Sequence, residues 1–464
     1  MSRKKTAVVI PKLVITNMGR EGIPYGYSEQ GRKIYVKDAV VGDICDVQIF
    51  KQVKGARIGK AIHFYRRSAL RIEPVCAHFS ICGGCQWQFV SYEQQLQWKW
   101  ELVKELFAPL TDIEIPSVLP SPQTLFYRNK LEFSATSDRW LTEAETAVEI
   151  TNKNALGYHV PDRWSKIFQV NQCYLQPDPS NQIRLVVKEL AEKLGMTFYN
   201  PITQIGTLRN VIIRTSTTGQ VMVIIAFYPS QLELQSVLLA ELIRAIPSIT
   251  SLYSVQNAKG NDTIYNCELS LVAGQPHIIE KLGDLQFAIT PKSFFQVNTP
   301  QAIKLFQTVL DFAQVTSKDL IYDLYCGTGA ISLFVAPHAC QVIGIELIPD
   351  AIQDAKLNAE LNHITNVEFL TGDLQITLQP ELIKKYGQPD LVITDPPRSG
   401  MTPKVIQQLL TILPQKIIYV SCNPVSQARD VQLLLTKYQI SQIQPVDMFP
   451  QTAHVENIVL LTHR

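Results

Sequence analysis

The sequence lacks any stretch of about 18 uncharged apolar residues, the length that a helix needs to cross a bilayer. The basic N-terminus, residues 1–5, is not followed by the long apolar run and small-residue cleavage site of a secretory signal. Repeats of 20–50 residues and low-complexity segments are absent as well. We therefore expect a cytoplasmic protein that is neither secreted nor embedded in a membrane. Nothing in the chain indicates an obligate protein partner.

A large net charge is also lacking, since 43 Lys and Arg oppose 41 Asp and Glu. The charge is unevenly distributed, however. Residues 1–70 hold 14 basic and 5 acidic residues, a balance of +9, whereas the remainder holds 29 and 36, a balance of −7. A basic front module on a mildly acidic body favours a polyanion-binding appendage, although a solvated basic surface has the same composition.

Nine cysteines in a long chain without a secretory signal do not resemble a disulfide framework. Four lie in or beside apolar runs, and we expect them to be buried as small hydrophobic residues: Cys45, Cys267, Cys326 and Cys340. The other five are candidates for chemistry.

The length of 464 residues predicts two to four domains. Short alternating strands separated by glycines predict an OB-like β-barrel over residues 1–62, a scaffold that often binds nucleic acid. Residues 63–285 begin with a cysteine cluster and a helix over 92–107, and continue as a central α+β domain. Residues 286–464 alternate strands with helices, which is typical of a doubly wound, Rossmann-like parallel sheet. The expected fold class is therefore α/β with these two additional domains.

A glycine loop follows the first strand of the α/β domain, running from Asp323 through Tyr325 to Gly329. Glu346 ends the next strand about twenty residues later, where an acid can bind both ribose hydroxyls. The full dinucleotide motif is missing because position 332 is Ser. Asp323 would repel a pyrophosphate but suits the ammonium and sulfonium groups of S-adenosylmethionine. The sequence therefore favours this methyl donor over NAD.

Two more acids follow later strands of the same domain. Asp373 would lie near the adenine, and Asp395, in Asp-Pro-Pro-Arg, would stand where substrate and methyl donor meet. For any one of these acids the alternative is a helix cap or a surface ion pair.

Cys422 ends an apolar strand in the run Ser-Cys-Asn-Pro, and Glu456 follows 34 residues later. Carbon 5 of uracil is a weak nucleophile, so its methylation requires a thiolate that adds to carbon 6 and a base that then removes the carbon-5 proton. Cys422 and Glu456 are the right pair of groups. A buried structural cysteine is the alternative, but its place at the carboxyl end of a strand favours catalysis.

Three cysteines, Cys76, Cys82 and Cys85, form a tight cluster with two glycines between the last two. A fourth thiolate would complete a tetrahedral zinc site or a [4Fe-4S] cluster, and Cys173 is the nearest downstream candidate. The spacing alone leaves both metals open.

Four segments together resemble the RNA uracil-5-methyltransferase family: Phe294–Asn298, Asp395–Gly400, Ser421–Pro424 and Asp447–Glu456. The resemblance implies that Cys422 is the nucleophile and Glu456 the base. It also implies a set of residues around S-adenosylmethionine, of which Asp373 is the least distinctive: Gln296, Tyr325, Glu346, Asp373 and Asp395.

The cysteine spacing is similar to that of the ribosomal-RNA branch of the family. That similarity implies a [4Fe-4S] cluster on Cys76, Cys82, Cys85 and Cys173, with zinc as the lesser alternative. It also implies that the barrel is a TRAM module that binds RNA. We expect methylation of a uridine in 23S ribosomal RNA, with transfer RNA as an alternative substrate. An iron–sulfur RNA-binding protein without methyltransferase activity is a second alternative, which the intact Cys422–Glu456 pair disfavours.

Overall fold

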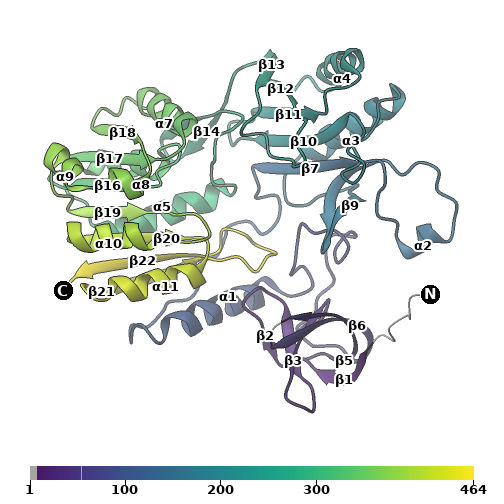
Figure 1. Cartoon of the computed structure of the whole chain (residues 1–464), viewed down its shortest axis with the longest axis horizontal. Helices are drawn as coiled ribbons and strands as arrows, with labels where there is room; N and C mark the ends of the chain where they lie inside the picture. Colours follow the sequence, from purple (N-terminus) through teal and green to yellow (C-terminus); the bar gives the residue numbers. More distant parts are fainter. Residues whose placement is uncertain (1–7, 54) are drawn as a thin grey trace.

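The computed structural model describes residues 8–53 and 55–464. Three bodies are visible in Figure 1: a small barrel near the N-terminus, a central body drawn in teal, and a C-terminal body drawn in green and yellow. None of the helices in the described part of the chain is long and apolar enough to cross a membrane.

The N-terminal body is a curled sheet of six strands in the order β1-β5-β6-β4-β3-β2. Its core consists of inward-facing apolar residues such as Leu13, Val36 and Val47. The sheet follows the strand pattern expected over this region, and two further strands, β2 and β3, lie in a stretch whose glycines indicate turns. The bounds are β1 (Val9–Val14), β2 (Asn17–Met18), β3 (Pro24–Tyr27), β4 (Lys33–Lys37), β5 (Ile44–Val53) and β6 (Ala56–Arg66).

Helix α1 (Tyr92–Phe107) follows the cysteine cluster and has the bounds predicted from the sequence. Ser91 caps its N-terminus by accepting a hydrogen bond from the Gln94 N–H. Val103 and Phe107 are fully buried in the core of the C-terminal sheet. The helix therefore packs on the C-terminal body, although the cluster before it packs on the central body.

The central body is a seven-stranded sheet in the order β13-β12-β11-β10-β7-β8-β9, antiparallel except for the pair β11–β12. Its elements are β7 (Lys130–Thr136), α2 (Glu143–Thr146), β8 (Ala155–Val160), β9 (Arg163–Gln169), α3 (Ser180–Lys193), β10 (Leu208–Thr215), β11 (Val221–Phe227), α4 (Leu232–Ala245), β12 (Ser251–Gln256) and β13 (Leu269–Gly274). The hairpin β14 (Ile278–Leu282) and β15 (Leu285–Ile289) leads to the C-terminal body.

The C-terminal body is a seven-stranded sheet in the order β18-β17-β16-β19-β20-β22-β21. The first five strands are parallel, whereas β22 runs antiparallel to both of its neighbours. The strands are β16 (Leu320–Leu324), β17 (Gln341–Glu346), β18 (Val367–Thr371), β19 (Leu391–Thr394), β20 (Lys416–Ser421), β21 (Tyr438–Val446) and β22 (Glu456–His463). The helices are α5 (Thr299–Ala313), α6 (Ala330–Val335), α7 (Pro349–Leu361), α8 (Leu374–Thr377), α9 (Pro380–Tyr386), α10 (Pro403–Ile412) and α11 (Pro424–Leu434).

This sheet has a separate apolar core on each face. Ile321 and Ile418 point into the core shared with α5, α6 and α7, whereas their neighbours Tyr322 and Tyr419 point into the core shared with α1, α10 and α11. Strands that are buried on both faces consist of continuous apolar residues, and this pattern allowed the strands to be predicted from the sequence. The strand order reverses between β16 and β19, and such a switch point opens a crevice at the carboxyl ends of the strands.

Two expectations about individual cysteines are wrong. Cys340 is exposed and Cys267 is only half-buried, whereas Cys45 and Cys326 are buried as expected. Cys340 lies directly before β17, which begins at Gln341, so it precedes the apolar residues that the sheet buries.

Candidate active site

The glycine loop lies at the switch point, between the end of β16 and the start of α6. Tyr325, Gly327 and Gly329 all have positive φ angles, of 62°, 55° and 80°. A Cβ at Gly329 would come within 2.8 Å of the Phe369 ring, so this position requires glycine for space as well as for conformation. The loop is thus a tight turn at the switch point of the sheet.

Glu346 and Asp373 lie beside this loop at the ends of β17 and β18. The two carboxylate oxygens of Glu346 accept hydrogen bonds from the N–H groups of Gly327, at 3.3 Å, and Ile348, at 3.0 Å. The Asp373 carboxylate caps α8 by accepting from the Gln375 N–H at 2.9 Å. Asp373 thus caps a helix, and Glu346 is half-buried beside the glycine loop.

Two further acids carry strongly perturbed pKa values. Burial raises the pKa of Asp323 to about 7, with Glu346 acting in the same direction and the Ser332 hydroxyl, 2.5 Å away, opposing it. Desolvation, followed by the nearby Asp323, also raises the pKa of Asp395 to about 7. An uncompensated cluster of acids at the crevice favours a positively charged ligand there.

Cys422 and Glu456 meet at the end of a strand ladder. In the antiparallel pair β20–β22, Ser421 lies opposite Asn457, so the next residue along each strand places Cys422 opposite Glu456. Cys422 is half-buried, and Glu456 is only 3% exposed. The thiol and the carboxyl are therefore neighbours at the same edge of the sheet as the glycine loop.

The electrostatics of this pair oppose ionisation. Burial raises the pKa of the Cys422 thiol to about 12, and Glu456 and Asp395 add to the effect while Arg398 counteracts it. Burial, then Asp395, raises the pKa of Glu456 well above its ordinary value, and Arg398 again acts in the opposite direction. Arg398 is thus a cation that favours the charged forms of both groups. In the sequence it was noted only as part of the Asp-Pro-Pro-Arg motif.

The segment that leads to Glu456 is anchored by residues from distant parts of the sequence. Lys99 on α1 donates to the Asp447 carboxylate at 2.6 Å, and both side chains are fully buried. The Gln95 side chain accepts from the Gln451 N–H at 2.8 Å and donates to its side-chain oxygen at 3.0 Å. Lys99 and Gln95 were not predicted from the sequence. Their spacing of four residues, continuing to Val103 and Phe107, puts two polar side chains on the buried face of α1, and this was the available signal.

Gln296 lies in the loop between β15 and α5. The Asn129 side chain donates to the Gln296 carbonyl at 2.9 Å, and the Thr328 hydroxyl donates to the Phe294 carbonyl at 3.4 Å. The second contact joins this loop to the glycine loop. Of the predicted cofactor residues, Glu346 ends β17, and Tyr325, Asp373 and Asp395 follow the ends of β16, β18 and β19 at the carboxyl edge of the sheet. Gln296 lies in the loop that contacts the glycine loop.

The four predicted metal ligands come together away from this crevice. Cys76, Cys82, Cys85 and Cys173 all line one cavity of about 20 Å³ between the cysteine segment and the central sheet. Burial raises the pKa values of Cys82 and Cys85 to about 12, and the pKa of Cys173 is also raised. Within the residues that the structure describes, no three His, Cys, Asp or Glu side chains converge closely enough to hold a metal ion as they stand. The thiols are neighbours with a suitable donor set, at distances wider than coordination.

Comparison with known proteins gives agreement over nearly the whole chain. A family model described as tRNA (uracil-5-)-methyltransferase matches residues 275–464. An uncharacterized RNA methyltransferase of Bacteroides thetaiotaomicron is 44% identical, with 93% of this chain and 97% of the relative covered. One of Porphyromonas gingivalis is 41% identical, with 92% and 95% covered. The crystal structure of Pyrococcus abyssi tRNA (uracil-54, C5)-methyltransferase with S-adenosyl-L-homocysteine matches at a TM-score of 0.77 and 27% identity, over 97% of this chain and 99% of that one.

The strand order, the glycine loop at the switch point and the antiparallel β22 define a Rossmann-like methyltransferase of the S-adenosylmethionine-dependent class. Two relatives that are more than 40% identical over nearly the full chain are described as RNA methyltransferases, which narrows this class to enzymes that act on RNA. The chain belongs to the RNA uracil-5-methyltransferase family.

Proposed function

We propose that this protein methylates carbon 5 of a uridine in 23S ribosomal RNA, using Cys422 as the nucleophile and Glu456 as the base. The observation that carries the mechanism is the position of these two side chains at the end of the β20–β22 ladder. S-adenosylmethionine supplies an electrophilic methyl group when it is bound. The residues proposed to hold it are Gln296, Tyr325, Glu346, Asp373 and Asp395, and the net negative charge of the crevice suits its sulfonium.

In the proposed reaction the Cys422 thiol loses its proton and the sulfur adds to carbon 6 of the flipped-out uracil. The ring becomes an enolate whose carbon 5 would take the methyl group, with S-adenosylhomocysteine as the leaving group. Glu456 then removes the proton from carbon 5, the bond from sulfur to carbon 6 breaks, and 5-methyluridine is released. The raised pKa of Cys422 means that the thiolate is scarce before RNA binds, and Arg398 is the cation that favours its formation.

Two substitutions test this mechanism. Cys422→Ala should abolish methyl transfer while RNA still binds with near wild-type affinity in a filter assay. Glu456→Gln should instead accumulate a covalent protein–RNA adduct in which the ring already carries the methyl group, visible as a slow band on a denaturing gel. Cys422→Ser on the Glu456→Gln background is the control, and it should form no adduct. Activity retained by Cys422→Ala would contradict the mechanism.

We further propose that Cys76, Cys82, Cys85 and Cys173 hold a [4Fe-4S] cluster, with zinc as the lesser alternative. Four thiols that line one largely buried cavity are a suitable donor set. The Gly84 N–H and the Gln88 amide lie 3.4 and 3.3 Å from the sulfurs of Cys82 and Cys85, contacts that stabilise thiolates. The role proposed for the cluster is to hold the cysteine segment against the central sheet. We expect the purified wild-type protein to be brown and to absorb near 400 nm. The Cys173→Ser variant should lack this absorption.

Transfer RNA is the second candidate substrate, because the Pyrococcus abyssi enzyme with the matching fold is named for a tRNA uridine. The cysteine cluster, together with a barrel proposed to be a TRAM module, is what favours ribosomal RNA. Mass mapping of 5-methyluridine in RNA from a strain that lacks this protein separates the two. Loss of a 23S modification is expected, and loss confined to transfer RNA would exclude the ribosomal assignment.

The three-part division of the chain, at residues 1–62, 63–285 and 286–464, is likewise a proposal. Because α1 packs on the C-terminal sheet, a fragment of residues 286–464 alone would expose the surface that Val103 and Phe107 cover. We expect residues 92–119 to be needed for the C-terminal part to be soluble.

A further inference from the structure

The hairpin of β8 and β9 projects from the central sheet toward the barrel (Figure 1). At its tip, Asp162 forms an ion pair with Lys37 of barrel strand β4. The Lys37 ammonium also lies 5.8 Å from the centre of the Phe50 ring on β5. Through this one lysine, the tip of the hairpin and the outer end of the β5–β6 hairpin are neighbours.

The cysteine segment also contacts this hairpin near its tip. A Cβ on Gly83 would lie 2.7 Å from the His159 carbonyl and 3.6 Å from the Pro161 ring, so the two backbones are in direct contact. The Tyr158 ring packs against Gly84 and lines the cavity of the four cysteines. The hairpin is therefore held near its tip by both the barrel and the cysteine segment.

Large aromatic side chains are exposed at this junction. Trp164, directly after the turn of the hairpin, is 68% exposed, and Phe50 is 52% exposed. Fixed aromatic side chains left in water are costly and mark a surface that another molecule covers. Nucleic-acid bases suit such side chains, because every base has a face that stacks on an aromatic ring.

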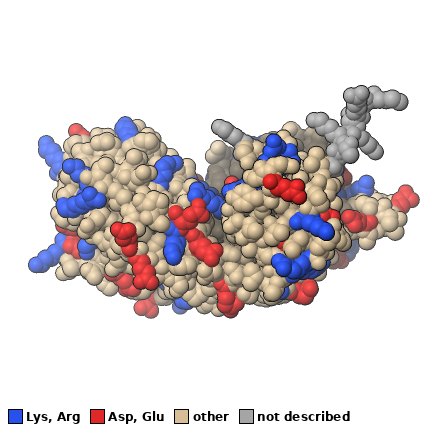
Figure 2. Space-filling view, turned by 90° about the horizontal axis from the view of Figure 1, so that it is seen from below, with Lys and Arg blue, Asp and Glu red and all other residues tan. Residues whose placement is uncertain are grey.

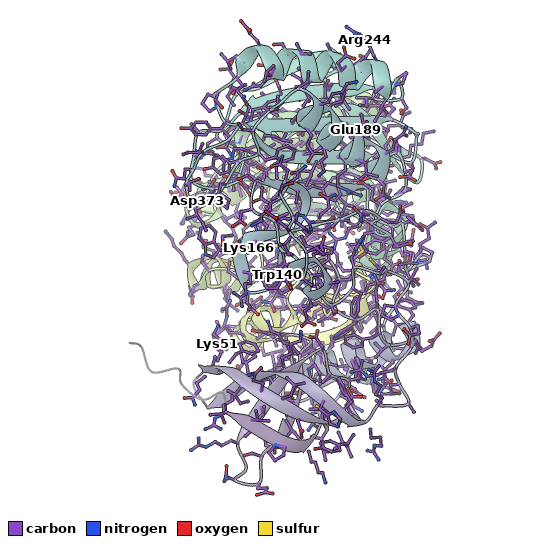
Figure 3. All side chains as sticks on the ribbon, turned by 90° about the vertical axis from the view of Figure 1, so that its right-hand side faces the viewer. Lys51, Trp140, Lys166, Glu189, Arg244 and Asp373 are labelled. Atoms are coloured by element: carbon purple, nitrogen blue, oxygen red, sulfur yellow. The ribbon has the colours of Figure 1, made fainter. Side chains whose placement is uncertain are left out.

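The charges around these rings favour a polyanion. Arg163, with its guanidinium 5.4 Å from the Trp140 ring, and Lys51 are exposed, and Lys51 and Trp140 lie on the same side of the molecule in Figure 3. Two of the acids around these residues are paired with lysines, Asp162 with Lys37 and Asp138 with Lys166. Figure 2 shows the molecule from below, with acidic and basic side chains interspersed over that face.

A series of contacts joins the junction to the catalytic segment. The N–H groups of Gln86 and Trp87 donate to the Gln451 carbonyl at 2.8 and 3.1 Å, and the Gln86 side chain accepts from the Ala453 N–H at 3.0 Å. The cysteine segment thus touches the chain near Glu456 at one end and the β8–β9 hairpin at the other.

We propose that Trp164 and Arg163, together with Phe50 and Lys51 of the barrel, form a docking surface for an unpaired segment of the substrate RNA that flanks the target uridine. This proposal rests on the proposed function, and it extends the RNA site beyond the barrel to a hairpin of the central body. Trp164 and Phe50 stack on bases, and Arg163 and Lys51 contact phosphates.

Direct binding of a uridine-containing RNA fragment with unpaired flanks tests the proposal, with methyl transfer measured in parallel. Trp164→Ala should weaken binding and raise KM about tenfold, the effect of losing one base stack, with kcat at saturating RNA unchanged. Trp164→Phe should restore most of the affinity, because the ring and not the indole N–H is required. Arg163→Gln should make the plot of log binding constant against log salt concentration less steep, by the amount that one phosphate contact contributes.

Leu232→Ala is the matched control, since Leu232 is also large, apolar and 61% exposed but lies on α4, far from the barrel (Figure 1). Equal affinities of wild type, Leu232→Ala and Trp164→Ala would overturn the docking surface. A similar loss of affinity in both variants would overturn it too, because the effect would then be general. Wild-type protein that binds the fragment through Trp164 but methylates no RNA would overturn the proposed function and leave the docking surface standing.

Discussion

Asp323 is the acid whose removal should change stability in the most informative way. Its side chain is 1% exposed, and one carboxylate oxygen accepts from Ser332 while the other, Oδ1, has no hydrogen-bond partner among the described residues. The pKa of this carboxyl rises from an ordinary 3.8 to about 7. The folded protein therefore holds this proton more tightly than the unfolded chain does.

The sign of the pH dependence follows from that difference. Between about pH 4 and pH 7 the folded state binds more protons than the unfolded state, so the free energy of unfolding falls as the pH rises through this window. Above pH 7 the full cost of the buried charge applies, which amounts to about 4 kcal/mol at 1.36 kcal/mol for each tenfold change. Below pH 4 the contribution vanishes.

Asp323→Asn removes the free-energy cost of the buried charge and introduces the smaller cost of an amide group without a hydrogen-bond partner. The amide cannot ionise, but its NH₂ group would stand where Oδ1 has no partner, at a cost of about 1–3 kcal/mol. We expect the variant to be about 1–3 kcal/mol more stable than wild type at pH 8 and equally or less stable at pH 5. Urea denaturation of ligand-free protein at both pH values measures the change, and Asp284→Asn in the exposed turn of the β14–β15 hairpin serves as the control. An unchanged difference between variant and wild type at the two pH values would refute the reasoning.

Three further predictions concern other parts of the site. Arg398→Gln removes the cation that favours the charged forms of Cys422 and Glu456, so the pH–rate profile should move to higher pH, by less than one unit because the arginine is exposed to solvent. Lys99→Met leaves the Asp447 carboxylate buried without its cation, and it should lower the free energy of unfolding in urea by about 3–5 kcal/mol. Gly344→Ala puts a Cβ within 2.5 Å of the Phe369 ring, and it should cost about 1–3 kcal/mol in the same assay.

The sequence predicted the parts of this protein whose signals are local. Helix α1 has the predicted bounds, because apolar periodicity and helix caps are properties of consecutive residues. Strands β2 and β3 were missed since they are short and rich in turn residues, and β2 pairs with β3, which in turn pairs with β4. Strand pairing between distant segments leaves little trace in a single sequence.

In the candidate active site, too, the features with local sequence signals were predicted and those that depend on distant segments were not. Cys422, Glu456 and the glycine loop each lie at the end of a strand, so their common position at one edge of the sheet follows from the topology. The anchors of the catalytic segment lie about 350 residues away, as the separation between Gln95 and Gln451 shows. Nothing near position 451 in the sequence indicates that partner, although a polar stripe on the buried face of α1 indicates that some partner is needed.

These anchors give a reason why the cysteine segment lies where it does. Glu456 begins β22, and the segment before it has no regular structure from Asp447 to Val455. Lys99, Gln95 and Gln86 hold this segment with side-chain hydrogen bonds, of which those of Lys99 and Gln95 are buried, and each loses strength steeply when its geometry is disturbed. A displaced cysteine segment would move Gln86 and with it the backbone at Ala453. Loss of the proposed cluster should therefore slow the step that uses Glu456, and Cys173→Ser should accumulate the same covalent adduct as Glu456→Gln to a smaller extent, whereas a rate change without any adduct would place the defect before the nucleophile acts.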